Sequence, residues 1–102
     1  MIHVIATIQL APGTRAPFLE EFRKVVPLVR GEEGCLEYGP TIDEPTGLRA
    51  QELAGEDVVV VVEKWESVAA LEAHTRAPHM EEYRGRVTNY VRGVQLQVLR
   101  PV

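Results

Sequence analysis

Five consecutive valines, Val58 to Val62, constrain the fold of this 102-residue chain more than any other feature. β-Branched residues favour strands, and neighbouring side chains of a strand point to opposite faces of its sheet. A run that is apolar on both faces therefore predicts a strand in a sheet that is covered on both sides. We expect this strand to extend to Trp65, the only tryptophan of the chain.

Hydrophobic periodicity predicts the elements that precede the valine run. Apolar residues alternate from Ile2 to Leu10 and predict a first strand, which Pro12 and Gly13 end. Apolar residues then recur at three- and four-residue steps, which predicts a helix from about 15 to 30. Pro27 lies inside this range, so we expect a kink or an early end of the helix there.

The rest of the chain alternates between turn signals and short periodic segments. The remaining expected elements are strands over 35–42 and 47–53 joined by a loop over 43–46, the strand over 58–65, a helix from Ser67 to about Thr75, a helix that begins at Pro78 and includes Val91, and a strand over 94–99. The main order is strand, helix, strand, strand, helix pair, strand. This order predicts a single domain over 1–102 with an α+β, ferredoxin-like split βαβ fold and an antiparallel sheet.

The predicted helices cover only one face of the sheet, whereas the valine run indicates that both faces are covered. No segment of the chain remains to cover the second face. A second copy of the chain is the simplest cover, so the sequence predicts a homodimer, a dimeric α/β barrel whose two sheets pack face to face.

Composition narrows the partners and the location. Fifteen acidic and eleven basic residues give a formal charge of −4, and the arginines are scattered, so we expect no nucleic-acid partner. No apolar run is long enough to span a bilayer, and the first ten residues do not read as a secretion signal. We therefore expect a cytoplasmic protein without a membrane partner. The single cysteine, Cys35, excludes an internal disulfide and is expected to be a small buried apolar side chain.

The segment after the valine run holds the groups best suited to chemistry. His74 is the catalytic candidate, because imidazole titrates near neutrality and burial favours the neutral form that a base requires. The alternative is a core or boundary histidine satisfied by one hydrogen bond. The other candidates are aromatic or ionisable side chains expected to contact substrate: Trp65, Tyr38, His79, Tyr83 and Glu63. Glu63 could instead orient a histidine or face water.

No cofactor or metal is expected. His74 and His79 are five residues apart with Pro78 between them, which is an awkward spacing for metal ligands, and no third ligand stands at a familiar offset. The chain has no glycine-rich phosphate loop, no dinucleotide fingerprint and no nucleophile elbow.

Several stretches together resemble the antibiotic biosynthesis monooxygenase family, and most of all its small bacterial quinol monooxygenases. These stretches are Trp65-Glu66-Ser67, Leu71, His74 and Pro78-His79-Met80, with Glu32-Glu33-Gly34-Cys35 and Tyr38. The resemblance implies a dimeric ferredoxin-like barrel that oxidises electron-rich aromatics, such as hydroquinones or anthrones, with dioxygen and without metal or flavin. It implies that His74 removes a phenolic proton or holds the phenolate, and that Trp65 forms a pocket wall.

Two other functions remain open at this point. One is an isomerase of a small polar metabolite that shuttles a proton between His74 and a carboxyl such as Glu63. The other is a non-catalytic, ligand-binding dimer. Haem degradation, which occurs in the same superfamily, is disfavoured, because Thr7, His74 and Arg84 stand where those relatives have asparagine, tryptophan and histidine.

Overall fold

The computed structural model describes residues 1–102 and contains four strands and three helices. In chain order these are β1 (Ile2–Leu10), α1 (Arg15–Arg30), β2 (Cys35–Thr41), β3 (Val58–Trp65), α2 (Val68–Thr75), α3 (Pro78–Val87) and β4 (Val91–Leu99). This order confirms the predicted α+β split βαβ arrangement.

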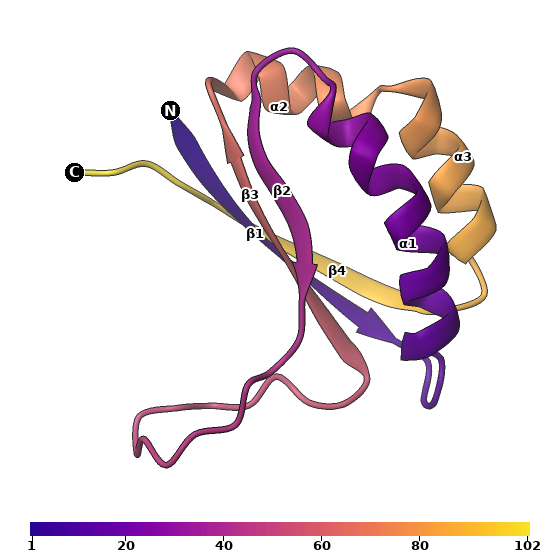
Figure 1. Cartoon of the computed structure of the whole chain (residues 1–102), viewed down its shortest axis with the longest axis vertical. Helices are drawn as coiled ribbons and strands as arrows, with labels where there is room; N and C mark the ends of the chain where they lie inside the picture. The colour runs from indigo at the N-terminus through magenta and orange to yellow at the C-terminus, as the bar shows by residue number, and fades with distance from the viewer.

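The four strands form one antiparallel sheet in the order β2-β3-β1-β4, and the three helices lie on the same side of it (Figure 1). Ala6 in β1 lies opposite Val61 in β3 and Leu96 in β4, so these three side chains share one face. On this face β1 and β3 bury every second residue, as period-two alternation requires. The core therefore lies between this face and the helices.

Helix α1 runs through Pro27 and ends only at Arg30, so the expected early end is wrong. Its buried residues repeat at helical spacing and are Phe18, Phe22, Val25, Val26 and Val29. Pro27 and Arg23, one turn before it, are both exposed. A proline has no N–H to donate to the carbonyl of the residue four positions before it, here Arg23. Because Arg23 is exposed, water can bond to this carbonyl instead.

The expected strand over 47–53 does not exist. Residues 42–57 form a loop that projects away from the sheet and the helices (Figure 1). Polar side chains hold the loop together: the Asp43 carboxylate accepts from the backbone N–H of Ala54 at 3.0 Å and of Gly55 at 2.9 Å, and Gln51 Oε1 accepts from the N–H of Thr46 at 2.9 Å. β2 pairs with β3 and is an edge strand of the sheet, and this segment does not pair with the free edge of β2.

Val91 was expected in the last helix, but it is the first residue of β4. Helix α3 ends at Val87, and the Tyr90 carbonyl accepts from the N–H of Ala11 at 2.7 Å. Pairing of Leu10 with Val91 extends β4 beyond the predicted start at Val94.

The chain itself covers only one face of the valine run. Val59 and Val61 are completely buried beneath the helices. On the opposite face Val58 and Val60 are half-buried and Val62 is 38% exposed. The homodimer that would cover this face stays a prediction. None of the helices has both the length and the apolar character needed to cross a membrane.

Candidate active site

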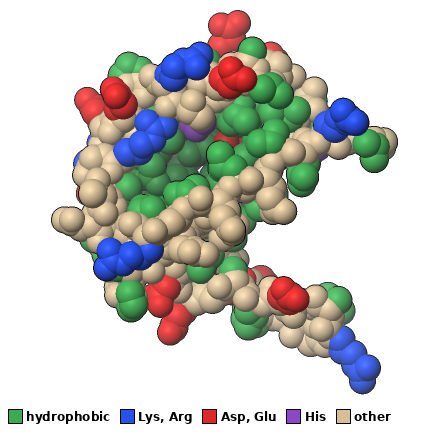
Figure 2. Space-filling view, turned by 180° about the vertical axis from the view of Figure 1, so that it is seen from behind, with side chains coloured by type: hydrophobic (Ala, Val, Ile, Leu, Met, Phe, Trp, Pro, Cys, Tyr) green, Lys and Arg blue, Asp and Glu red, His purple; other side chains and the backbone are tan.

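A cavity of about 510 Å³ opens on the helix side of the sheet, and Figure 2 shows it as a hollow with hydrophobic side chains across its floor. Most of the surrounding residues are apolar, as is typical of a pocket for an apolar ligand. The lining residues are Ala6, Ile8, Phe22, Tyr38, Val61, Glu63, Leu71, His74, Thr75, Met80, Tyr83, Arg84, Val87, Thr88, Val91, Val94 and Leu96.

The cavity exists because the sheet extends beyond its helices. Val94 and Leu96 in β4 lie opposite Ile8 and Ala6, on the face that the helices cover elsewhere. Yet each is 56% exposed. The small side chain of Ala6 adds space at the floor. The result is an apolar hollow bounded by α3, the sheet and the uncovered strand β4.

His74 reaches this cavity from α2. Ser67 caps the helix, because its hydroxyl accepts from the N–H of Ala70 at 3.1 Å. The helix turns His74 toward the sheet, where the residue is only 5% exposed. Its ring lies 4.8 Å from that of Trp65 and 5.4 Å, edge-on, from that of Tyr38. Burial lowers the pKa of His74 and so favours neutral imidazole.

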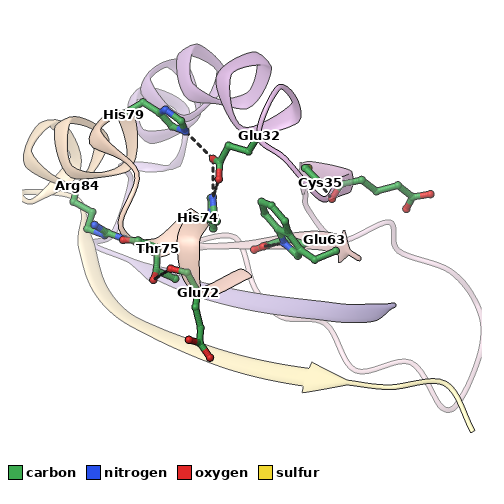
Figure 3. Close-up of polar contacts among 10 residues, drawn as sticks. Glu32, Cys35, Glu63, Glu72, His74, Thr75, His79 and Arg84 are labelled. Atoms are coloured by element: carbon green, nitrogen blue, oxygen red, sulfur yellow. Dashed lines mark hydrogen bonds and ion pairs between the residues drawn. The ribbon is translucent and has the colours of Figure 1, made fainter. Parts of the chain in front are cut away.

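Glu32 connects His74 to His79 (Figure 3). His74 Nδ1 lies 2.9 and 3.2 Å from the two carboxylate oxygens, and His79 Nε2 lies 2.7 Å from Oε2. The Glu32 side chain is only 14% exposed. His74 Nε2 makes no hydrogen bond within the chain. Every fully buried side-chain nitrogen or oxygen in the structure has a hydrogen-bond partner, so Nε2 is not fully buried. We therefore infer that it faces the cavity that His74 lines.

The turn between α1 and β2 places Glu32 beside α2. The Glu32 N–H donates to the Val29 carbonyl at 2.9 Å, and the Glu66 N–H donates to the Gly34 carbonyl at 2.8 Å. Gly34 adopts φ of 84°, and a Cβ there would lie 2.6 Å from the Cβ of Ala70. Only glycine fits this conformation and this close approach.

Glu63 is a buried carboxyl on β3 that lines the same cavity. Its Oε1 accepts from Trp65 Nε1 at 2.9 Å. Burial raises the pKa of Glu63 to about 7; the Trp65 hydrogen bond opposes this rise and the nearby Glu32 charge adds to it. Glu63 makes no hydrogen bond to a histidine, so its partner is the indole.

Two phenols also line the cavity. Burial raises the pKa of Tyr38 and of Tyr83, so both hydroxyls stay protonated near neutral pH. Neither hydroxyl makes a hydrogen bond within the chain. Because every fully buried side-chain polar atom has a partner, both hydroxyl oxygens must be accessible from outside the core. Both are free to bond to a ligand.

Arg84 lies at the edge of the cavity, where its Nη2 donates to the Thr75 carbonyl at 2.6 Å (Figure 3). Its positive charge contributes to the lowered pKa of His74. The same charge favours an anion in the cavity.

Of the residues predicted for the site, His74, Tyr38, Tyr83 and Glu63 line one cavity, and the other two do not. Trp65 is completely buried and packs against His74. Glu32 was not among the residues predicted for the site, although it lies in the stretch Glu32 to Cys35 that carries part of the family resemblance.

Arg84, which also lines the cavity, was not among the residues predicted for the site. Glu32, His74 and His79 are residue types that bind metals, but the structure has no group of three such side chains arranged to hold a metal ion. The cluster is instead connected by hydrogen bonds to one carboxylate.

Residues 1–86 match the model of the antibiotic biosynthesis monooxygenase family, so the chain belongs to this family. This confirms the resemblance in the sequence and, at the level of the family, the expected enzyme class, a monooxygenase. One relative is the Escherichia coli (strain K12) protein named probable quinol monooxygenase YgiN. It is 42% identical over 103 aligned residues, which cover 99% of this chain and 98% of the relative.

Solved structures agree with the fold. PA3566 from Pseudomonas aeruginosa superposes with a TM-score of 0.81 and 27% identity, over 99% of this chain and 93% of that one. Rv0793 from Mycobacterium tuberculosis gives a TM-score of 0.79 and 26% identity, over 99% and 94%. The ferredoxin-like α+β fold is thereby confirmed.

Proposed function

We propose that the chain oxidises an electron-rich aromatic of the quinol or anthrone type with dioxygen, without metal or flavin, and that His74 removes the phenolic proton. One observation carries the proposal: neutral His74 has an unpartnered Nε2 at an apolar cavity and a carboxylate behind its Nδ1. The quinol named for the Escherichia coli relative supports the substrate class.

The proposed reaction begins with transfer of the phenolic proton to His74 Nε2. The phenolate passes one electron to dioxygen, and the resulting superoxide and aryloxyl radical combine at a ring carbon that carries hydrogen. The imidazolium returns its proton to the outer peroxide oxygen. The O–O bond then breaks as that carbon loses its hydrogen as a proton, so one oxygen atom stays as a carbonyl and the other leaves as water. Proton transfer by a positioned base contributes about 100- to 10,000-fold.

The other polar residues of the cavity suit this substrate. The Tyr38 and Tyr83 hydroxyls have no partner within the chain, and Glu63 has a second oxygen beyond its bond to Trp65. These groups would hold the second hydroxyl of a hydroquinone, while Arg84 favours the phenolate. The apolar walls exclude water from the anion.

Oxygen uptake with a reduced naphthoquinone tests the proposal. Wild type should consume oxygen faster than autoxidation, and His74→Ala should lose about 100-fold or more of that rate. Glu72→Ala is a matched control, because Glu72 is exposed on the same helix as His74 and does not line the cavity. Uptake by wild type no faster than autoxidation would refute the proposed function.

A proton-shuttling isomerase is the second candidate. His74 and Glu63 line one cavity, and burial raises the pKa of Glu63 to about 7 while it lowers the pKa of His74, so at neutral pH Glu63 can supply a proton and neutral His74 can accept one. This function needs no oxygen. Turnover of a small polar substrate in an anaerobic vessel would favour it over the oxygenase.

We also propose that the chain functions as a homodimer. The sheet face away from the helices carries Ile5, Val58, Val60 and Val62, and no element of the chain packs over it. Burial of apolar surface at about 25 cal/mol per Å² favours a second sheet against this face.

A further inference from the structure

Glu32 receives hydrogen bonds from two histidines that lie 42 and 47 residues away in the sequence. The three side chains come from three segments: Glu32 from the turn after α1, His74 from α2 and His79 from the first turn of α3. Figure 3 shows the carboxylate between the two rings. The exposed fraction of the side chain rises from 6% at His74 to 14% at Glu32 and 23% at His79.

An ionised carboxylate only accepts hydrogen bonds. His74 must therefore carry its proton on Nδ1, which faces Glu32, and its lone pair lies on Nε2, which opens on the cavity. The other neutral tautomer would point an N–H into the cavity and set two lone pairs against each other at Glu32. Of the two neutral forms, only the one with its proton on Nδ1 can take a proton from a ligand in the cavity.

His79 holds the carboxylate in turn. Both histidines contact Oε2 of Glu32, and His79 Nε2 makes the shorter contact, 2.7 Å. His79 follows Pro78 at the start of α3, where the helix dipole favours a neighbouring negative charge. His79 does not line the cavity, so its contact with Glu32 is its evident role.

We infer that Glu32 and His79 are positioning residues: Glu32 fixes His74 in the tautomer that presents a basic Nε2 to the cavity, and His79 fixes Glu32. The inference rests on the proposed function for its effect on rate. When His74 becomes imidazolium, the Glu32 carboxylate stabilises the charge without removing the proton. His74 can then return that proton to the peroxide oxygen. Base, orienting carboxylate and outer donor follow the logic of a catalytic triad.

Nitrogen-15 NMR reads the tautomer without any assay of activity. The labelled wild-type protein is measured well above the ordinary pKa of imidazole, and His74→Ala and His79→Leu assign the signals. We expect His74 with a protonated Nδ1 and an unprotonated Nε2. A His74 protonated on Nε2 in wild type would overturn the inference. Backbone-to-ring assignment of the labelled wild-type protein identifies the His74 signals if the variants do not fold.

Steady-state kinetics then test the two residues separately. Glu32→Gln removes the negative charge that stabilises the imidazolium and replaces one acceptor oxygen with an NH₂ group, so kcat should fall about 100-fold or more with KM changed little. His79→Leu should lower kcat about 10-fold, and His79→Gln, which keeps an N–H donor, should restore part of the loss. Glu33→Gln is the matched control, since Glu33 is exposed and makes no hydrogen bond through its side chain.

The outcomes separate the two proposals. Wild-type kcat and an unchanged His74 tautomer in Glu32→Gln would overturn the positioning role, as would an equal loss in Glu33→Gln. If wild type shows no oxygen uptake, the proposed function fails, whereas the tautomer in the NMR spectra still decides for or against the cluster.

Discussion

The imidazole of His74 lies against the indole of Trp65, with ring centroids 4.8 Å apart and planes inclined by 37°. The same indole donates its Nε1–H to Glu63. Trp65 therefore contacts two of the ionisable groups that line the cavity: His74 through its ring face and Glu63 through its N–H. Trp65 was predicted to form a pocket wall; in the structure it is buried and packs beneath His74, which lines the cavity.

Trp65→Phe should cost more stability at alkaline pH than at acid pH. Glu63 ionises with a pKa of about 7, and the buried carboxylate needs the indole N–H more than the neutral acid does. Leaving a buried polar group without its partner costs about 1–3 kcal/mol, more when it is charged. Urea denaturation of Trp65→Phe and wild type at about pH 5 and about pH 8 measures the difference. A loss equal at both pH values would mean that only packing was lost.

Glu63→Gln should flatten the dependence of stability on pH. The pKa of Glu63 is about 7 in the folded protein against 4.5 ordinarily, so between these values the folded state binds a proton that the unfolded state lacks. Stability therefore falls as the pH rises through this range, by about 3 kcal/mol at about 1.36 kcal/mol per pKa unit. Glutamine has no proton to lose. Denaturation curves across this range should show the wild-type slope disappear; a retained slope would assign it to other groups.

The pH dependence of kcat/KM should report His74. The pKa of His74 lies below its ordinary 6.5, because burial and the nearby His79 and Arg84 outweigh Glu32. The neutral base should persist as the pH falls to about 6.5, with the acid limb below it. Glu32→Gln removes the group that raises this pKa, so its acid limb should move to lower pH. Tyr38 stays protonated throughout. Glu63 lines the same cavity with a pKa of about 7, so the profile is repeated in Glu63→Gln to separate its contribution from that of His74. An acid limb that moves upward would contradict this account.

Gly34→Ala should lower both stability and activity. The substitution places a side chain on a residue with φ of 84° and sets its Cβ against Ala70, so the turn that carries Glu32 must move. Strain of this kind costs about 1–3 kcal/mol. Gly85→Ala is the control, because it lies in α3 with nothing within 4 Å of the added Cβ, and alanine should stabilise a helix there by about 0.5–1 kcal/mol. Equal thermal stability of the two variants would remove the constraint claimed for Gly34.

Val60→Glu should convert the proposed homodimer into a monomer. Val60 is half-buried on the face away from the helices, where a charge would be desolvated only if a second sheet covered it. Val68→Glu, at a position 49% exposed on α2, should leave the assembly intact. Analytical ultracentrifugation of both variants and wild type measures the oligomeric state. A monomeric wild type at micromolar concentration would end the dimer proposal.

Much of the fold could be predicted because its signals are local. The alternation in β1, the valines of β3 and the helical spacing of α1 each reflect burial on one face of one element. The strand expected over 47–53 failed because a strand also needs a partner, which no local pattern specifies. The prediction of Val91 in the last helix failed for the same reason, because the pairing of Val91 with Leu10 places it in β4.

The site could be predicted only in part. His74 and Glu63 stood out by residue type near the valine strand, and Tyr38 and Tyr83 stood out as aromatic side chains with a hydroxyl group. Glu32 did not, because its role arises from contacts 42 and 47 residues away that exist only after folding. The projecting 42–57 loop likewise depends on individual side-chain bonds, such as those of Asp43, that periodicity does not reveal.

The uncovered helix-side face of β4 separates two tasks between different parts of the chain. Val94 and Leu96 shape one flank of the hollow, whereas the side chains proposed to handle protons, Glu32, His74 and His79, come from the turn after α1 and from α2 and α3. Exchanges along that last strand can thus resize the chamber while leaving the acid–base machinery untouched. Substitutions in β4 could therefore change which substrates fit the cavity without changing the proposed acid–base residues.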